Sequence, residues 1–377
     1  MFHHINISDI HGVAYGDPYN FYQDELVEII EYILDNEVDL ITIAGDLFHT
    51  IYKADSLEIN VMMKFMHQLI TAASTKDAAV RLIRGTDSHD YDQLQLFDNY
   101  ETDDWCDVKI IEKPTNEEFP NGLVFKYLPE EYTEDYNEYK KDNLIDDVDV
   151  VVFHGLVEGA LKYAEGKQHK EVVLGVDDLY NCMRLYTVGG HIHTRTFITD
   201  DIWYSGSFSA KDYNDANEKK GFDHIVINDA QKDYEIKFIE NENAPKFITK
   251  DLSEDFMISS KDTIRARLLS ISKDKREKEH IRIDVDSSNL NQKQKDTLSF
   301  LQVKFRTIFD FKVYKDEIDT EDKVIKKKVE KANRILDKDV PIEDKIESEL
   351  KEYKDKFELT DDDIDINKIK DLIDKKN

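Results

Sequence analysis

The sequence predicts an α/β fold with a polar site along one edge of a sheet. Short apolar runs such as LITIA at 40–44 are typical of parallel strands that are covered on both faces. Segments with apolar residues at helical spacing separate these runs, so the first part of the chain reads strand, helix, strand, helix, strand. A polar segment follows each strand, as Gly45 and Asp46 follow the run at 40–44. Open α/β sheets bind ligands at the carboxyl ends of their strands, so the pattern also indicates where a site would lie.

The same two patterns give the elements of the first part in order. We expect strands at residues 2–8, 40–44, 79–84, 108–112, 124–128 and 149–153, and helices at 20–36 and 55–74. Residues 156–180 show neither period and are expected to form a loop or an irregular helix. Apolar segments follow at 184–188, 196–198 and 202–207, and then two alternating strands at 224–228 and 233–239, which read as an antiparallel hairpin or meander.

The pattern changes near residues 241–245, where we expect a domain boundary. A helix at 261–272 precedes a small β-α-β module, whose elements are expected at 281–285, 292–309 and 311–314. From residue 320 onward charged residues dominate and short apolar sets recur. This tail is expected to be a solvated or partly disordered helical appendage, or a set of helices that folds onto a partner. The expected domains are 1–243, 244–319 and 320–377.

Composition limits the class of protein. No apolar run is long enough to span a bilayer, and because the chain begins directly as a strand we expect no signal peptide. Cys106 and Cys182 have no partner motif and are expected to be reduced thiols. We therefore expect a cytoplasmic protein with no membrane partner. The composition is rich in Lys, Ile, Asp and Asn, which suggests an A·T-rich genome, of a bacterium or of a phage in its host.

The formal net charge of −30 bears on the choice of partner. A typical nucleic-acid binder shows a basic patch, and this chain as a whole is acidic. Two alternatives remain open. The acidic residues are solvated surface, some of them gathered around cations, or the protein avoids polyanions altogether. A local basic patch can persist within an acidic total, so composition does not decide between them.

Five segments far apart in the sequence place carboxylate, imidazole or hydroxyl groups at the ends of predicted strands. Their members are Asp9, His11, Asp46, Ser88, His89, His154, His191 and His193. A mixed set of nitrogen and oxygen donors suits divalent ions such as Mn, Fe or Zn. The set is too large for one tetrahedral site, and two ions that share Asp46 as a bridge fit it better. Two neighbouring ions can clamp the attacking and leaving oxygens of a phosphoryl transfer.

The order of these motifs resembles the calcineurin-like metallophosphoesterase superfamily. D-x-H, G-D, G…H-D, H-G and G-H-x-H occur in this order over residues 9–193. A narrower resemblance, to the SbcD-type nuclease subunits of DNA repair complexes and their phage relatives, comes from AGDLFH at 44–49, YSGSF at 204–208 and EKKGF at 218–222. The resemblance implies a two-sheet α/β sandwich as the metallophosphoesterase core, a small α+β capping domain and a helical C-terminal tail.

The resemblance also implies roles for these residues. One ion would be held by Asp9, His11 and His193, the second by His154 and His191, and Asp46 would bridge them. His89 would lie beside the phosphate, where it stabilises developing charge or protonates the leaving oxygen. Asp90 would orient the ring of His89, and His49 would line the cleft.

One segment departs from the family pattern. The family usually has G-N-H-D/E, in which the Asn binds the second ion, whereas this chain has GTDSHD at 85–90. The hydroxyl of Ser88, the carboxylate of Asp87 or a water would take the place of the amide. A neutral hydroxyl is a poorer ligand, so we expect the second ion to bind weakly and activity to need high Mn.

These observations leave more than one function. The first hypothesis is a Mn-dependent DNA exonuclease or endonuclease with two divalent ions, for which Mg, Fe and Zn are alternatives. By resemblance it would act on duplex ends and single-stranded DNA, as a homodimer with an SbcC-type coiled-coil ATPase. The second hypothesis is a metallophosphatase of the same superfamily that acts on a small-molecule or protein phosphoester. The third is an acidic interaction protein that keeps the fold without the activity.

Overall fold

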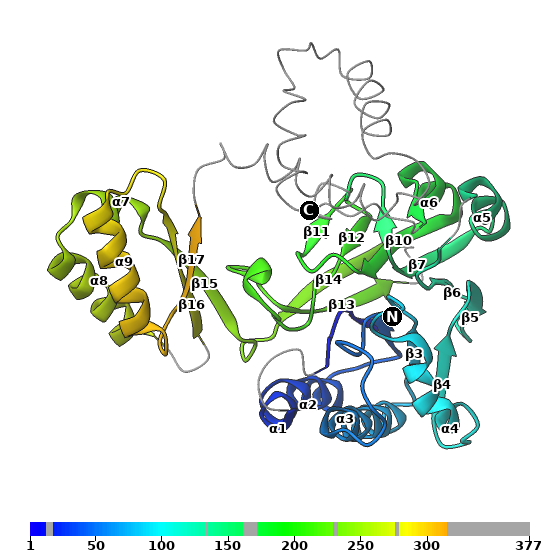
Figure 1. The fold of residues 1–377 in the computed structure, drawn as a ribbon. Coiled ribbons are helices and arrows are strands. Elements are labelled where there is room, and N and C mark those ends of the chain that lie inside the picture. The colour runs from blue at the N-terminus through cyan, green and yellow to red at the C-terminus, as the bar shows by residue number, and fades with distance from the viewer. Residues whose placement is uncertain (13–17, 133–134, 161–171, 229–232, 276–278, 315–377) are drawn as a thin grey trace, which may run out of the picture. The chain divides into compact units, whose positions relative to one another are not determined.

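The computed structural model describes all residues except 13–17, 133–134, 161–171, 229–232, 276–278 and 315–377, and Figure 1 shows the fold. The predicted tail at 320–377 lies outside the described residues. Residues 1–285 with 290–313 form one compact unit. The division expected at residues 243 and 244 stays a prediction.

Six strands form the first large sheet, in the order β14-β13-β1-β2-β3-β4. Their bounds are Phe2–Ile7 (β1), Leu40–Ala44 (β2), Ala79–Ile83 (β3), Asp107–Ile111 (β4), Gly221–Asn228 (β13) and Asp233–Glu240 (β14). Strands β1 to β4 are parallel, as the buried apolar runs predict. The predicted hairpin of β13 and β14 is present, and β13 pairs antiparallel with β1.

Six further strands form the second large sheet, in the order β11-β12-β10-β7-β6-β5. Their bounds are Thr115–Glu118 (β5), Val124–Leu128 (β6), Val148–His154 (β7), Met183–Gly190 (β10), Thr196–Phe197 (β11) and Ile202–Tyr204 (β12). Strands β6, β7, β10 and β12 are parallel, and the two outer strands are antiparallel to their neighbours. The short strands β8 (Leu156–Val157) and β9 (Val173–Leu174) pair separately, in the region expected to be irregular.

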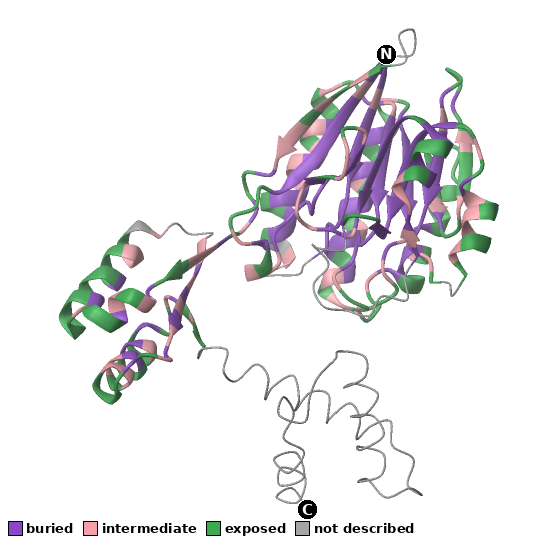
Figure 2. Cartoon of the chain, turned by 90° about the horizontal axis from the view of Figure 1, so that it is seen from above, coloured by how far each residue is buried: buried purple, intermediate pink, exposed green. Residues whose placement is uncertain are grey.

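The two sheets pack face to face. Leu40 and Ala79 of the first sheet share one apolar cluster with Phe125, Val150 and Val188 of the second. A second cluster joins the other face of the first sheet to helices α2 (Val27–Asp35) and α3 (Leu57–Ser74), and a third joins the second sheet to α6 (Val176–Cys182). Figure 2 shows the buried residues gathered on these strands. The expected two-sheet α/β sandwich is therefore confirmed.

The helices follow the predicted pattern with one interruption. Helix α3 begins after Ser56, whose hydroxyl oxygen accepts the N–H of Ile59 (3.2 Å) as an N-cap. The helix expected at 20–36 is divided into α1 (Pro18–Phe21), the π-helical η1 (Tyr22–Leu26) and α2, a change of turn that apolar spacing alone does not reveal. The remaining helices of this part are η2 (Tyr91–Phe97), α4 (Asp98–Glu101), α5 (Tyr136–Asn143) and η3 (Tyr213–Asp215).

The residues after 245 form a smaller sheet with its own apolar core. Its strands are β15 (Lys246–Asp251), β16 (Glu279–Asp286) and β17 (Asp310–Tyr314), in that order. Three helices, α7 (Ser253–Ile258), α8 (Lys261–Asp274) and α9 (Gln292–Phe305), complete the module, and β15 is the strand that the sequence pattern did not predict. Leu268, Ile283 and Leu301 belong to its core. Among the helices that the structure describes, none has the length and apolar character to cross a membrane.

Candidate metal centre

The side chains predicted to form the site lie at the carboxyl ends of parallel strands. Asp9 and His11 follow β1, Asp46 follows β2, His154 ends β7 and His191 follows β10. Strands β1 and β2 belong to the first large sheet, and β7 and β10 belong to the second. Both layers of the sandwich therefore contribute to one centre at the edge where such sheets bind ligands.

Four of these residues hold a left-handed backbone, although none is glycine. The φ angle is 49° at Asp9, 47° at His11, 52° at Asp46 and 97° at His191. Such conformations cost about 1–3 kcal/mol each and collect at functional sites. Loop hydrogen bonds hold them: the N–H of Asp9 donates to the Gly45 carbonyl (3.1 Å), and the N–H of His11 donates to the Asp46 carbonyl (2.9 Å). The strained turns are thus supported by one another.

Two glycines let these segments approach closely. A Cβ atom on Gly45 would lie 2.1 Å from His154 Nδ1, and one on Gly190 would lie 2.4 Å from the Ala44 carbonyl oxygen. His154 Nδ1 donates a hydrogen bond to the Ala44 carbonyl oxygen at 2.8 Å. That bond fixes the tautomer, so Nε2 of the neutral ring is the atom that faces the centre and is available to an ion.

One group of possible ligands contains Asp9, His11 and His193, whose ligand atoms lie within 4.8 Å of one another. Nε2 of His11 lies 2.9 Å from Nε2 of His193, which lies 3.8 Å from Asp9 Oδ1. Burial, with His193 and Lys211 nearby, lowers the pKa of His11 well below its usual value. Two imidazole nitrogens this close require a proton or another cation between them. Asp215 lies 3.4 Å from the other nitrogen of His193, so Nε2 is left for the centre.

Asp46 lies between this group and a second one, where a bridging ligand would be needed. Its Oδ2 is 3.8 Å from His11 Nε2, and its Oδ1 is 3.4 Å from His154 Nε2. The second group contains His154, His191 and Glu130, again within 4.8 Å. Within the described part of the chain, His154 Nε2 is buried and has no hydrogen-bond partner. An orphaned nitrogen beside carboxylates fits a divalent ion, and the individual ligand roles stay predictions.

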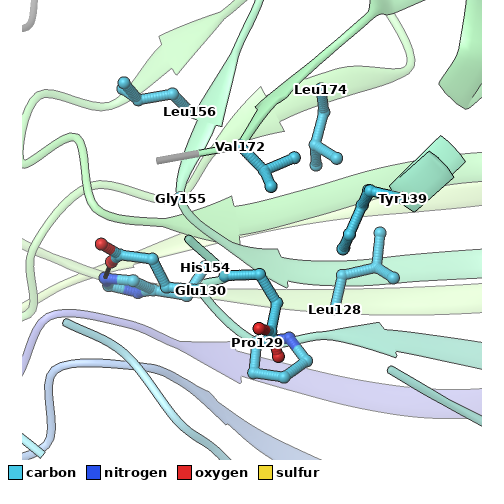
Figure 3. Close-up of a pocket in the computed structure, with 10 residues that line it drawn as sticks. Leu128, Pro129, Glu130, Tyr139, His154, Gly155, Leu156, Val172 and Leu174 are labelled. Carbon is cyan, nitrogen blue, oxygen red and sulfur yellow. Dashed lines mark ion pairs between the residues drawn. The ribbon is translucent and has the colours of Figure 1, made fainter. Parts of the chain in front are cut away.

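Glu130 is the member of this centre that the sequence pattern did not single out. It is 1% exposed, and its Oε2 lies 3.5 Å from both His154 Nε2 and His191 Nδ1. Figure 3 shows Glu130 and His154 turned toward one another beside a small pocket. Burial by itself would raise the pKa of Glu130, but His191, His154 and Tyr132 lower it to about 2. The sequence signal that could have identified Glu130 is its position, since it is an acidic residue two places beyond the strand predicted at 124–128.

The segment at 86–90 contains Ser88, a predicted ligand of the second ion. Ser88 is exposed, and its side chain forms no hydrogen bond with the residues that the structure describes. Thr86 is the residue that meets the carboxylates, since its N–H donates to Asp46 Oδ1 (2.7 Å) and its hydroxyl donates to Glu130 Oε2 (3.0 Å). The assignment of Ser88 as a ligand therefore gains no support from this geometry.

His89 and His49 lie beside the first group, and with His11 they place three ligand atoms within 4.8 Å of one another. His89 Nδ1 donates to the carbonyl oxygen of His49, which leaves its Nε2 at 3.8 Å from Asp46 Oδ2. Burial lowers the pKa of both His89 and His49. The carboxylate of Asp90 accepts three backbone N–H groups of the loops after β2 and β3, and the His49 carbonyl oxygen accepts from the ring of His89, so the role predicted for Asp90 gains no support from this geometry.

Comparison with known proteins agrees with this geometry. The family described as calcineurin-like phosphoesterase matches residues 5–195, slightly more than half of the chain. This span contains all the predicted metal ligands, and the family implies metal-dependent hydrolysis of a phosphoester. A solved structure that is similar to the chain shares 12% sequence identity, with 64% of this chain and 99% of that chain covered and a TM-score of 0.39. The family model matches more than half of the chain, and the motifs of the family lie together at one sheet edge. The chain therefore belongs to the calcineurin-like phosphoesterase family.

Proposed function

We propose that this chain is a nuclease of the SbcD type, which hydrolyses phosphodiester bonds of DNA. The observation that carries the proposal concerns the two segments that resemble these nucleases, at 204–208 and 218–222. Both segments donate a hydrogen bond to the backbone of His193, a predicted metal ligand. The N–H of Ser207 donates to the His193 carbonyl oxygen at 3.0 Å, and Lys220 Nζ donates to the same oxygen at 3.0 Å.

The segment at 204–208 also supports the ligands on β1. Ser8, next to Asp9, donates its hydroxyl to the Gly206 carbonyl oxygen (2.9 Å) and accepts the N–H of Phe208 at its own carbonyl (3.0 Å). The resemblance to nucleases therefore falls on residues that shape the metal centre. The small α+β module after residue 245 is a further feature that hydrolysis of a simple phosphoester does not need.

The chain's own residues suggest how a phosphodiester would be handled. Two divalent ions, Mn²⁺ in this proposal and Mg²⁺, Fe²⁺ or Zn²⁺ as alternatives, would supply charge stabilisation and a more acidic water. Because the carbonyl of His49 fixes Nδ1 of His89, Nε2 of His89 is free to exchange a proton with a phosphoryl oxygen. Lys211 Nζ lies 3.4 Å from His193 Nε2 and places a positive charge where it attracts a phosphate group.

A substrate comparison tests the proposal. The purified full chain is incubated with linear duplex DNA, single-stranded DNA, a phosphodiester and a phosphomonoester chromogenic substrate, each with Mn²⁺ or Mg²⁺. Asp46→Ala serves as the control for contaminating nuclease, because it removes the predicted bridge. We expect metal-dependent DNA cleavage that Asp46→Ala abolishes. Hydrolysis of the phosphomonoester without cleavage of either DNA would overturn the proposal.

That second outcome describes the alternative function, a metallophosphatase that acts on a small-molecule or protein phosphoester. The formal net charge of −30 is the observation that favours it, since polyanions are repelled by an acidic surface. The catalytic centre is the same in both proposals, and only the substrate differs.

The partners belong to the proposal as well. By resemblance the chain would form a homodimer in the cytoplasm and bind an SbcC-type coiled-coil ATPase through the tail at 320–377, which lies outside the described residues. A chain truncated after residue 319 that still co-purifies with such an ATPase would refute this role for the tail. Retention of metal-dependent cleavage by the same truncated chain would show that the centre itself is intact.

A further inference from the structure

A buried carboxylate, that of Glu130, lies 3.5 Å from His154 and from His191, the predicted ligands of the second ion. We propose that Glu130 is a ligand of the second divalent ion, in place of the Asn of the family's G-N-H-D/E motif. The inference rests on the two-ion centre of the proposed function, and it concerns how this chain holds the second ion. In this arrangement two carboxylates, from Asp46 and Glu130, and two imidazoles, from His154 and His191, surround that ion.

The ligand atoms of Glu130, His154 and His191 lie within 4.8 Å of one another, as donors to one ion would. Two donor atoms that each lie about 2.1 Å from one ion are about 3.0 Å apart at a right angle and about 3.4 Å apart at the tetrahedral angle. Glu130 Oε2 lies 3.5 Å from His154 Nε2 and 3.5 Å from His191 Nδ1. Asp46 Oδ1 lies 3.4 Å from His154 Nε2. These separations are long for direct hydrogen bonds and suit atoms arranged around a shared centre.

The surroundings of Glu130 give it no permanent cation within the described residues. Hydroxyl groups hold it in place, since Tyr132 donates to Oε1 at 2.5 Å and Thr86 donates to Oε2 at 3.0 Å. The guanidinium of Arg84 contacts the backbone of Glu130 and not its carboxylate, since Nη2 of Arg84 donates to the Glu130 carbonyl oxygen at 2.8 Å. A carboxylate that is 1% exposed is costly unless it is paired or binds a metal.

An independent observation points to the same place. His154 Nε2 is buried and lacks a hydrogen-bond partner in the described part of the chain, although its Nδ1 is satisfied by the Ala44 carbonyl. The geometry of the variant segment agrees, since Thr86 bonds both Asp46 and Glu130 while Ser88 is exposed. The longer loop thus removes the amide and supports a carboxylate in its stead.

The exchange changes the charge of the site. With Asn, the second ion would meet one carboxylate, shared with the first ion, whereas Glu130 adds a second negative charge. The second ion is then expected to bind tightly, which reverses the weak binding expected from a Ser88 hydroxyl. Oxygen-rich ligand sets also favour harder ions such as Mn²⁺ over ions that prefer nitrogen and sulfur ligands.

Metal titration of the full chain tests this without substrate. Mn²⁺ binding is measured by calorimetry and by the electron paramagnetic resonance signal of free Mn²⁺, for the wild type, Glu130→Gln and Glu131→Gln. Glu131 is the matched control, a neighbouring acid whose carboxylate lies 3.4 Å from Arg84. We expect two ions per wild-type chain. Glu130→Gln should weaken one of them by at least about 10-fold, the lower end of the loss caused by changing even the partners of metal ligands. Glu131→Gln should change neither.

Three results would overturn the inference: a wild-type chain that binds one ion only, a folded Glu130→Gln chain that binds two ions with wild-type affinity, or an equal loss in both variants. If Glu130→Gln does not fold, Glu130→Asp is measured instead, because it keeps the negative charge but shortens the side chain by one methylene. Unchanged affinity for both ions in Glu130→Asp would also overturn the inference. The proposed nuclease function fails separately, when a chain that binds two ions cleaves no DNA.

Discussion

Asp90 ties the two loops of the centre together, and its removal should destabilise the fold. The side chain is fully buried. Oδ2 accepts the N–H groups of Asp46 (2.9 Å) and Gly85 (2.8 Å), and Oδ1 accepts the N–H of Phe48 (3.2 Å). A buried N–H that is left without its acceptor costs about 1–3 kcal/mol, and losses above about 4–5 kcal/mol are exceptional for one substitution. Because three buried N–H groups lose their acceptor together, Asp90→Ala should lower the free energy of unfolding by about 3–5 kcal/mol.

The assay is urea unfolding at neutral pH with a chelator present, so that metal binding does not contribute to the stability. Asp92→Ala is the matched control, because Asp92 is exposed on the neighbouring η2 helix and should change stability by at most about 0.5 kcal/mol. Asp90→Asn keeps one acceptor oxygen and should fall between the two. If Asp90→Ala proves as stable as the Asp92 variant, the three backbone bonds do not hold these loops and the reasoning fails.

The remaining predictions concern stability, metal affinity and turnover. Burial would raise the pKa of Glu117, but hydrogen bonds from Arg81 and Lys109 lower it to about 2, below its ordinary 4.5. The stabilisation is therefore present above pH 4.5 and disappears as the pH falls toward 2, so Glu117→Gln should cost about 3 kcal/mol in urea unfolding at pH 7 and nothing near pH 2. Gly45→Ala should weaken Mn²⁺ binding in calorimetry, because its Cβ would lie 2.1 Å from the ring of His154; unchanged affinity would show that the loop adapts. His89→Ala should spare Mn²⁺ binding and lower turnover by about 10²-fold or more, whereas a parallel loss of binding would make His89 a ligand.

The parts of the fold that the sequence predicts well are those with a strong local signal. The runs at 40–44 and 149–153 are apolar at every position or nearly so, because strands covered on both faces have no solvent side to alternate with. The site followed from the same strands, since parallel strands bring their carboxyl ends to one edge. Asp46 and His154 are distant in sequence, yet each stands directly at such an end.

Other features depend on contacts between distant segments and have no local signal. The pairing of β13 with β1 is set by packing across more than two hundred residues of chain, so spacing within either strand does not reveal it. The resemblance pairs Asp90 with His89, whereas the backbone groups that its carboxylate accepts lie on two separate loops. Glu130 was hidden in an acidic stretch, where one more carboxylate carries little information, and only its burial distinguishes it.

The acidity of the chain and the proposed action on DNA are compatible once charge is considered locally. At physiological ionic strength the field of an exposed charge is screened within about 8 Å, so distant surface carboxylates act weakly on a phosphate at the centre. The charges that matter are those near the centre, among them the carboxylates of Asp9, Asp46 and Glu130, which the two proposed divalent ions would neutralise. Two bound divalent ions would set four positive charges against these three carboxylates, and Asp215 beside His193 is paired with Lys220 at 2.8 Å. With Lys211 also beside His193, the centre would attract an anion. A single scissile phosphate could therefore bind at the centre without further contacts to the rest of the DNA. Any longer contact with DNA would come from another surface or from a partner subunit.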